Sequence, residues 1–353
     1  MPKIKDIVIT PDMLNKIAEI DQFIGSWNTD NLKLTPAELN VMKRVATIES
    51  VGSSNRIEGN KMTDAEIEEL FSRINKKSFS SRDEEEVAGY SDLIDTIFES
   101  YEDILLTENY IKQLHQILLK YSSKDERHRG EYKTDSNRVA AYDASGKEIG
   151  TIFETATPFD TPRLMRELLQ WTNDTFEDKF LHPIITIGIF IVHFLSIHPF
   201  TDGNGRLSRA LTILLMLRNK YSYMPYASME SMIEASKDAY YRALRGTQKT
   251  IWSDKVDYEP WLTFFVTSLQ KQKRSLEDKI QKLQKANTDG LPSTAHMILG
   301  LFAEKSNLSM PEIIQKTGKN SETVRKSVQG LVKKGFLTKL GSTKGVSYML
   351  NKQ

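Results

Sequence analysis

The stretch His198–Arg209 reads HPFTDGNGRLSR and lies between two apolar runs. Upstream, residues 184–197 are almost entirely apolar, a pattern that is typical of a buried helix. Downstream, leucines at positions 207, 211, 214, 215 and 217 predict a second helix that packs in the core. The polar string is therefore expected to be a loop held at both ends by buried helices.

Two glycines give this loop its conformational freedom. Gly203 and Gly205 permit backbone conformations that other residues resist, and Pro199 ends helical geometry. A loop of this kind before a helix start directs several N–H groups at one point, where the helix dipole also favours an anion. Arg206 and Arg209 lie three residues apart, on one face of the first helical turns, and arginine suits bidentate phosphate binding. The pattern indicates a phosphate site.

The two remaining polar residues suggest what happens at that site. Asp202 is a hard oxygen ligand, and Mg²⁺ is commonly held by one or two carboxylates together with substrate phosphates. His198 can act as a base near neutral pH and take a proton from an attacking hydroxyl. The combination predicts transfer of a phosphorus-containing group. A plain Gly-Asn turn beside a core histidine would explain GNG alone, but not the twelve residues in this order.

The whole string resembles the signature of the Fic family, HPFxDGNGRxxR, at every fixed position. The resemblance implies a mainly α fold, a Fic-type helical bundle with a small β-hairpin flap. It also implies transfer of AMP from ATP, with Mg²⁺, to a Ser, Thr or Tyr hydroxyl of a target protein, with release of diphosphate.

The family resemblance assigns a role to each motif residue. His198 would deprotonate the acceptor hydroxyl, and Asp202 would hold Mg²⁺ between the α- and β-phosphates. The remaining residues would bind the phosphates, the first three as an anion hole and the last two at the outer phosphates: Gly203, Asn204, Gly205, Arg206 and Arg209. Related Doc-type kinases carry a lysine-containing loop in place of GNG, so the glycines here favour AMP transfer over phosphate transfer.

An inhibitory element is expected in an N-terminal helical region, residues 1–110. Thr35 and Pro36 are typical of a helix start, and Gly59 is typical of a helix end, which predicts a helix over residues 36–59. Near its end, Ser54 and Glu58 resemble the family's inhibitory motif, (S/T)xxxE(G/N). The resemblance implies that Glu58 pairs with Arg209 where the γ-phosphate would bind; an ordinary capped helix end is the alternative.

Residues 130–164 break the helical pattern within the expected catalytic core, residues 111–286. Residues 139–142 and 148–153 predict two strands around a turn. This position matches the flap of Fic proteins, at residues 138–156, with Phe153, Glu154 and Thr155 over the nucleotide. Residues 130–133 read GEYK and match the family's flap entrance with lysine in place of arginine. A purely structural hairpin remains the alternative.

Other polar residues receive weaker interpretations. Tyr240 and Tyr241 match a tyrosine pair that lies near the adenine and ribose in relatives, and Gln248 stands where asparagine is common; core tyrosines are the alternative. The charged run at residues 81–87 is interpreted as a solvated helix start. His115 is interpreted as structural or exposed, and His193 as a core residue.

Composition limits the remaining possibilities. The chain has 353 residues, a formal net charge of +1 and no cysteine, which excludes disulfides and thiol catalysis. The start lacks the apolar core of a signal peptide, and the run before His198 falls short of the roughly 20 residues of a membrane span. We therefore expect a cytoplasmic protein without a membrane partner.

The C-terminal segment, residues 291–353, differs in charge from the rest. It contains ten Lys and Arg against three Asp and Glu, a net charge of +7, and follows a linker at residues 287–292. The predicted order of helices and strands resembles a winged-helix domain. Its recognition helix would span residues 321–334 and carry four basic residues, Arg325, Lys326, Lys333 and Lys334. DNA contact and docking of a protein or a second subunit are both compatible with this pattern.

Two functions of different class follow. The first is a self-inhibited protein adenylyltransferase, in which self-modification, AMP removal and a homodimer are further options. The second is a DNA-binding regulator that uses the Fic body as a nucleotide sensor. His198 favours the first, because a sensor needs the phosphate cradle but no base.

Overall fold

The computed structural model describes residues 2, 6–27, 32, 34–73, 79–142, 148–288, 291–302, 305, 307–341 and 346–351. The chain is mainly helical and forms two compact units. The first comprises Met1–Gly25 and Thr47–Lys273, and the second comprises Ser26–Ala46 and Arg274–Gln353. Helices α2 (Pro36–Ile57) and α11 (Glu259–Thr288) are divided between the two units, and the last residue of α1 (Pro11–Ser26) belongs to the second.

The first unit is built around two buried helices, α7 (Pro183–Ile197) and α8 (Asn204–Arg218). Every residue from Ile184 to Ile197 is buried, as the apolar run predicted. The other helices of this unit are α1 (Pro11–Ser26), α3 (Asp64–Arg73), α4 (Arg82–Ser100), α5 (Glu108–Leu118), α6 (Thr161–Asp178), the short 3₁₀ helix η2 (Met224–Tyr226), α9 (Met229–Glu234) and α10 (Lys237–Gln248). Helices α6 and α10 pack on α7, whereas α4 and α5 pack on α8.

Helix α11 crosses α7 closely because α7 carries Gly188 at the contact. A Cβ atom at this position would lie 2.8 Å from Leu262 and 3.1 Å from Phe265. The indole N–H of Trp261 donates a 2.7 Å hydrogen bond to the carbonyl oxygen of Gly188. The close crossing leaves the C-terminal end of α7 fixed within the core, and His198 follows directly.

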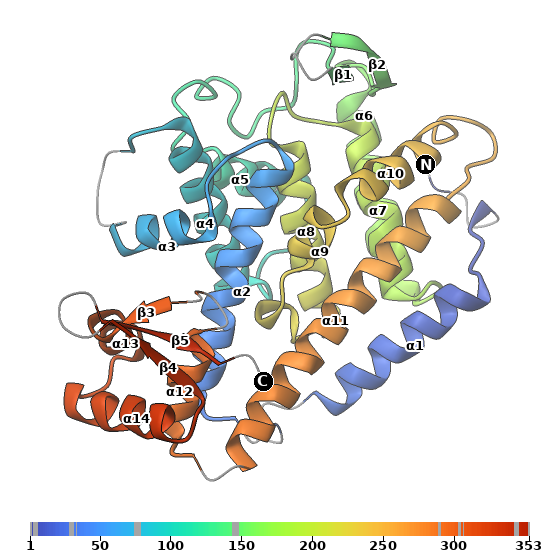
Figure 1. Ribbon diagram of the computed structural model, residues 1–353. Coiled ribbons are helices and arrows are strands. Elements are labelled where there is room, and N and C mark those ends of the chain that lie inside the picture. The colour runs from blue at the N-terminus through green and yellow to red at the C-terminus, as the bar shows by residue number, and fades with distance from the viewer. Residues whose placement is uncertain are drawn as a thin grey trace. The chain divides into compact units, whose positions relative to one another are not determined.

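The hairpin expected at residues 138–156 is present as strands β1 (Arg138–Tyr142) and β2 (Glu148–Glu154), which pair antiparallel. It projects from the helices of this unit close to α6 (Figure 1). The turn expected at residues 143–147 lies outside the described residues.

The second unit contains α12 (Ser293–Leu301), β3 (Asn307–Ser309), α13 (Met310–Thr317), α14 (Ser321–Lys333), β4 (Leu337–Leu340) and β5 (Ser347–Leu350). The three strands form an antiparallel sheet in the order β3-β5-β4. Residues of this segment alone, from Leu291 to Tyr348, form a buried apolar cluster. The segment therefore has a core of its own.

Most expected elements appear within a few residues of their predicted bounds. Helix α2 begins at Pro36 behind a capping box, in which the backbone N–H groups of Thr35 and Glu38 bond each other's side chains at 2.6 and 3.2 Å. It ends at Ile57, and Gly59 has φ 100°, which suits glycine after a helix. Strand β3 was not expected, because three residues give no detectable alternation of apolar and polar side chains. None of the helices among the described residues combines the length and apolar character that crossing a bilayer requires.

Candidate active site

His198 terminates α7 in an unusual backbone conformation. It has φ 51°, in the left-handed region that non-glycine residues rarely adopt, and its N–H donates to the carbonyl oxygen of Phe194 at 2.8 Å. Its Nδ1 lies 3.2 Å from the carbonyl oxygen of Leu195. Because a carbonyl can only accept, Nδ1 carries the proton and Nε2 keeps a free lone pair.

The protonation state of His198 follows from its surroundings. Burial of the ring lowers its pKa to about 4, and the nearby Lys133 ammonium acts in the same direction. The hydrogen bond to Leu195 and the Glu58 and Asp202 carboxylates oppose this shift. The imidazole is therefore neutral at physiological pH and able to accept a proton through Nε2.

Asn204 and Gly203 shape the loop between His198 and α8. The Asn204 side chain bonds both backbone groups of Phe200, accepting from its N–H at 3.0 Å and donating to its carbonyl oxygen at 2.7 Å. Gly203 has φ 78°, and its N–H donates to Asp202 Oδ1 at 2.6 Å. The loop is closed in this way directly before the N-terminus of α8, where unpaired N–H groups and the helix dipole favour an anion.

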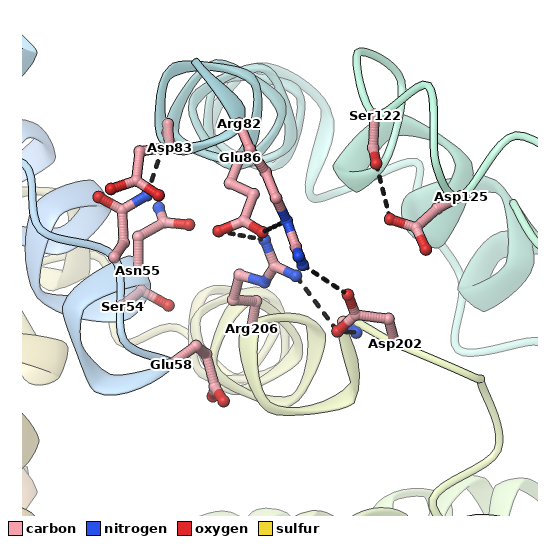
Figure 2. Close-up of polar contacts among 12 residues, drawn as sticks. Ser54, Asn55, Glu58, Arg82, Asp83, Glu86, Ser122, Asp125, Asp202 and Arg206 are labelled. Atoms are coloured by element: carbon pink, nitrogen blue, oxygen red, sulfur yellow. Dashed lines mark hydrogen bonds and ion pairs between the residues drawn. The ribbon is translucent and has the colours of Figure 1, made fainter. Parts of the chain in front are cut away.

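Asp202 belongs to a cluster of two carboxylates and two arginines (Figure 2). Arg206 approaches Asp202 Oδ1 at 3.4 Å and Glu86 at 3.6 Å, while Arg82 approaches Glu86 at 2.8 Å and Asp202 Oδ2 at 3.5 Å. Burial alone would raise the pKa of Asp202, but Arg206, the Gly203 N–H and Arg82 lower it below its ordinary value. The carboxylate is therefore charged and available to a cation at neutral pH.

Arg209 is buried with only 4% of its surface exposed, and α2 supplies its partners. Its Nη2 lies 2.8 Å from Glu58 Oε1 and donates to the carbonyl oxygen of Ser54 at 2.9 Å, while its Nε donates to Ser54 Oγ at 2.8 Å. The expected pair between Glu58 and Arg209 is thus present. Glycine at position 205 is needed here, because a Cβ atom would overlap the Glu58 carboxylate.

The two arginines retain donors for a further anion. The Nε and Nη1 atoms of Arg206 and the Nη1 atom of Arg209 are buried and have no hydrogen-bond partner within the described part of the chain. A buried donor without a partner is costly, and a phosphate oxygen would satisfy it. Asp202 adds a carboxylate of the kind that Mg²⁺ prefers. The residues present therefore fit a magnesium-bound polyphosphate.

Tyr240 and Tyr241 lie on α10, near the Glu58–Arg209 ion pair. Tyr240 is 3% exposed, and its ring lies 5.1 Å from that of Tyr241 and 5.8 Å from that of Trp261. Burial raises the pKa of Tyr240, and the Arg209 charge opposes this shift. The structure thus brings Tyr240 to Arg209, whereas Gln248 is buried at the C-terminal end of the same helix.

The three flap residues Phe153, Glu154 and Thr155 differ in exposure and in hydrogen bonding. Phe153 is half-buried and Glu154 is exposed at the end of β2. Thr155, the residue that follows, directs its hydroxyl to Asn137 and Lys133, at 2.7 and 2.9 Å. The bonding of Thr155 therefore connects the flap to the chain beneath it.

The interpretation of residues 81–87 as a solvated face holds for the exposed Arg82 but not for Glu86, whose side chain is only 12% exposed. Arg82 and Glu86 contact Asp202 and Arg206, as described above. Their spacing is that of an ordinary i,i+4 surface pair, so the pattern held no sign of a distant partner.

His115, interpreted from the sequence as structural or exposed, is structural and not exposed. It is fully buried, accepts from the Gly130 N–H at 2.9 Å through Nδ1, and lies 3.0 Å from the Asp202 carbonyl oxygen through Nε2. Its ring also stacks on Phe200 at 3.8 Å. Burial lowers its pKa to about 4, so the neutral ring supports the motif loop from below. His193, expected in the core, is fully buried and bonds the Tyr258 hydroxyl at 2.8 Å.

Comparison with known proteins shows what the segment that carries this site resembles. Residues 105–216 match the Fic/DOC family. The chain is 29% identical over 110 residues to a probable protein adenylyltransferase of Aquifex aeolicus, covering 31% of this chain and 33% of that protein. It is 28% identical over 181 residues to the protein adenylyltransferase Fic of Drosophila melanogaster, covering 51% of this chain and 34% of that protein.

The fold is also that of solved Fic proteins. A Fic family protein from Desulfovibrio desulfuricans superposes with a TM-score of 0.63 at 22% identity, covering 99% of this chain and 98% of that chain. Fic-1 from C. elegans superposes with a TM-score of 0.61 at 18% identity, covering 76% and 73%. Residues 105–216 are thus similar to the Fic/DOC family, and the chain spans about a third of the length of the curated relatives it matches.

Proposed function

We propose that this protein transfers AMP from ATP to a Ser, Thr or Tyr hydroxyl of a target protein and is held inactive by Glu58. The observation that carries the proposal is the juxtaposition of a neutral His198 with an arginine-lined cradle, one arginine of which is occupied by a carboxylate from α2. The reaction is also supported by the relatives that are adenylyltransferases. Neither the site nor these relatives specify the target protein.

The reaction requires one proton transfer and one exchange of bonds at phosphorus. His198 Nε2 takes the proton of the acceptor hydroxyl, whose oxygen forms a bond to the α-phosphorus. The bond from that phosphorus to the bridging oxygen breaks, and diphosphate leaves. Arg206 and Arg209 would hold the outer phosphates, and the Gly203–Gly205 loop would orient the group between them. When bound at Asp202, Mg²⁺ would neutralise charge on the α- and β-phosphates.

Inhibition follows from the pair between Glu58 and Arg209. An arginine bonded to Ser54 and Glu58 has fewer donors for a γ-phosphate, and the carboxylate repels that phosphate. ATP would then bind with its α-phosphate out of line with the acceptor oxygen. A misplacement of about 1 Å can cost roughly 10²-fold in rate.

Three variants test this proposal with labelled ATP and self-modification as the readout. Glu58→Gly is expected to raise AMP transfer by about 10²-fold while changing ATP affinity much less. Arg209→Ala is expected to stay inactive, because it removes the phosphate ligand together with the inhibitory pair. The double variant should behave as Arg209→Ala. An unchanged rate in Glu58→Gly would show that Glu58 is not the inhibitor, and absence of transfer in every variant would favour the nucleotide-sensor alternative.

For residues 291–353 we propose a winged-helix domain that contacts DNA backbone through α14. The observation that favours it is the exposure of Arg325, Lys326, Lys333 and Lys334 on or beside that helix; Lys326 is partly neutralised by Glu322 at 2.9 Å. A chain that ends at residue 288 is expected to keep self-modification, because the removed segment has its own core.

DNA binding can be measured directly. Affinity of the full chain for duplex DNA should fall steeply as salt rises, and Lys333→Gln with Lys334→Gln should reduce the slope by about two. Lys305→Gln, whose ammonium is paired with Glu312 at 2.8 Å, serves as the matched control. Salt-independent binding or no binding would point instead to a protein that docks on this segment.

A further inference from the structure

The backbone around His198 depends on one buried lysine. Helix α7 ends at Ile197, because His198 is left-handed and Pro199 cannot continue a helix. The four carbonyl oxygens of residues 197–200 therefore accept no hydrogen bond from a following turn of helix. Lys133 satisfies the first and third of them: its ammonium donates to Ile197 at 3.0 Å, and its backbone N–H donates to Pro199 at 2.9 Å.

Asn137 bonds the other two carbonyls of the same stretch, the second of which also accepts from Asn204. Its amide donates to the His198 carbonyl oxygen at 3.3 Å and to that of Phe200 at 2.9 Å. The Lys133 ammonium in turn donates to Asn137 Oδ1 at 2.7 Å, which fixes the orientation of the amide. The backbone on both sides of His198 is therefore held by two residues from the segment before β1.

The same ammonium reaches the flap. It donates to Thr155 Oγ1 at 2.9 Å, and the Thr155 hydroxyl donates to the carbonyl oxygen of Asn137 at 2.7 Å. Thr155 directly follows β2, the second strand of the flap. One side chain thus bonds both the end of α7 and the base of the flap.

Stability alone does not account for a charge in this position. Lys133 is only 4% exposed, and within the described residues its ammonium donates to three neutral oxygens and to no carboxylate. A buried ammonium without an anionic partner is costly. Desolvation accordingly lowers the pKa of Lys133 to about 8. The C-terminal end of the α7 dipole offsets part of this cost.

We propose that Lys133 is a positioning residue for AMP transfer. It holds the flap and the backbone of His198 in a fixed position relative to each other. The proposal rests on the function proposed above. The flap of an adenylyltransferase presents the acceptor side chain, and His198 takes its proton, so the two parts must be held at a fixed separation. The Lys133 ammonium donates to Asn137, Thr155 and Ile197, so Lys133 would act through the flap and the backbone on either side of His198.

Four substitutions test the proposal in the Glu58→Gly protein, where transfer is expected to be measurable. Lys133→Met should lower kcat by about 10²-fold, while the KM for ATP and ATP binding change less than about threefold, because the misplaced groups lie on the acceptor side. Lys133→Arg should recover at least tenfold of that loss, since it retains the charge and the donors. Thr155→Val removes the hydroxyl that bonds both Lys133 and Asn137, and since each hydrogen bond is worth about 1 kcal/mol it should cost at least about fivefold. Lys255→Met, on an exposed loop, should equal the parent.

A second readout does not depend on activity. The charged groups that act on the His198 ring are Lys133, Glu58 and Asp202, and the lysine opposes ring protonation. In the same Glu58→Gly background, NMR titration of the His198 ring should show a higher pKa in Lys133→Met than in the parent, and Lys133→Arg should restore the parent value.

The outcomes separate this proposal from the proposed function. A folded Lys133→Met protein with the parent kcat, an equal loss of ATP binding, or an unmoved His198 titration would overturn the role of Lys133. If Lys133→Met does not fold, a parent-like kcat in Thr155→Val overturns it. If even the Glu58→Gly parent transfers no AMP, the proposed function fails, and the His198 titration alone decides whether Lys133 positions that residue.

Discussion

His198 is the residue whose substitution gives the most direct information about chemistry. His198→Ala in the Glu58→Gly protein is expected to lower AMP transfer by about 10²–10⁴-fold, the usual cost of losing a general base. ATP binding should remain nearly intact, because the phosphate donors belong to Arg206 and Arg209. Single-turnover transfer of labelled AMP, together with an ATP binding isotherm, measures both quantities. His128→Ala, outside the motif, is the control, and a His198→Ala protein with the parent rate would exclude His198 as the base.

For single residues, the sequence predicted contacts between residues that lie close together in the chain and missed contacts between residues that lie far apart in it. The motif from His198 to Arg209 is local, so its backbone and charges could be inferred from spacing. His115 is 87 residues from Asp202, whose carbonyl oxygen it contacts, and Lys133 is 64 residues from Ile197. The sequence matched Lys133 to the family's flap entrance but gave no sign of its contact with Ile197, and it gave no sign of the contact between His115 and Asp202. Glu58 was found, 151 residues from Arg209, only because its motif resembles that of a known family.

Helix α2 is the element on which regulation is proposed to depend, and Arg56 fixes its C-terminal end. The Arg56 guanidinium donates to both carboxylate oxygens of Glu234 on α9, at 2.7 and 3.0 Å, and to Asp64 on α3 at 2.8 Å. Ser50, two turns earlier, donates to the buried Glu230 at 3.0 Å. The end of α2 is thus held by α9 as well as by Arg209.

Loosening this end should release part of the inhibition. A partly exposed ion pair contributes roughly 0.5–1 kcal/mol, so Arg56→Met should raise basal AMP transfer by about two- to fivefold. The same substitution in the Glu58→Gly protein should have no further effect, because the inhibitory carboxylate is already absent. Arg73→Met, which removes only an exposed pair with Glu69, is the matched control. Equal activation with and without Glu58 would mean that Arg56 acts by another route.

Among the elements, long apolar or well-capped helices were predictable, and small or composite ones were not. Helix α13 occupies its expected residues because a capping box and a left-handed Gly318 define both ends. Helix α11 was expected to belong to the main body alone, but its residues are divided between the two compact units. Apolar spacing predicts a helix and the width of its buried face, but it does not say which part of the chain covers that face.

The stability of the whole molecule should fall in weak acid because of buried histidines. Burial lowers the pKa of His115 and His198 to about 4 and that of His193 to about 3. Between pH 6.5 and these values the unfolded chain binds protons that the folded chain does not. The free energy of unfolding is therefore largest above pH 6.5 and is lost as the pH falls, by up to about 1.4 kcal/mol per pH unit for each ring.

His193→Gln isolates one of these contributions. Glutamine keeps a polar partner for the Tyr258 hydroxyl but does not titrate. Urea unfolding between pH 7 and pH 5 should show a pH dependence flatter by about 1.4 kcal/mol per unit below pH 6.5 than in the parent protein. Parallel curves for the two proteins would show that His193 is not buried in its neutral form.

The carboxylate of Glu58 and the guanidinium of Arg209 belong to one compact unit of a single chain. The effective concentration of Glu58 at Arg209 is consequently set by the fold and does not change when the protein is diluted. An inhibitor on a separate chain would dissociate on dilution, whereas Glu58, the inhibitor proposed here, remains tethered beside Arg209. A ligand that activates the protein must therefore compete with a tethered group, and it can do so only by binding more tightly to the molecule in which α2 has moved.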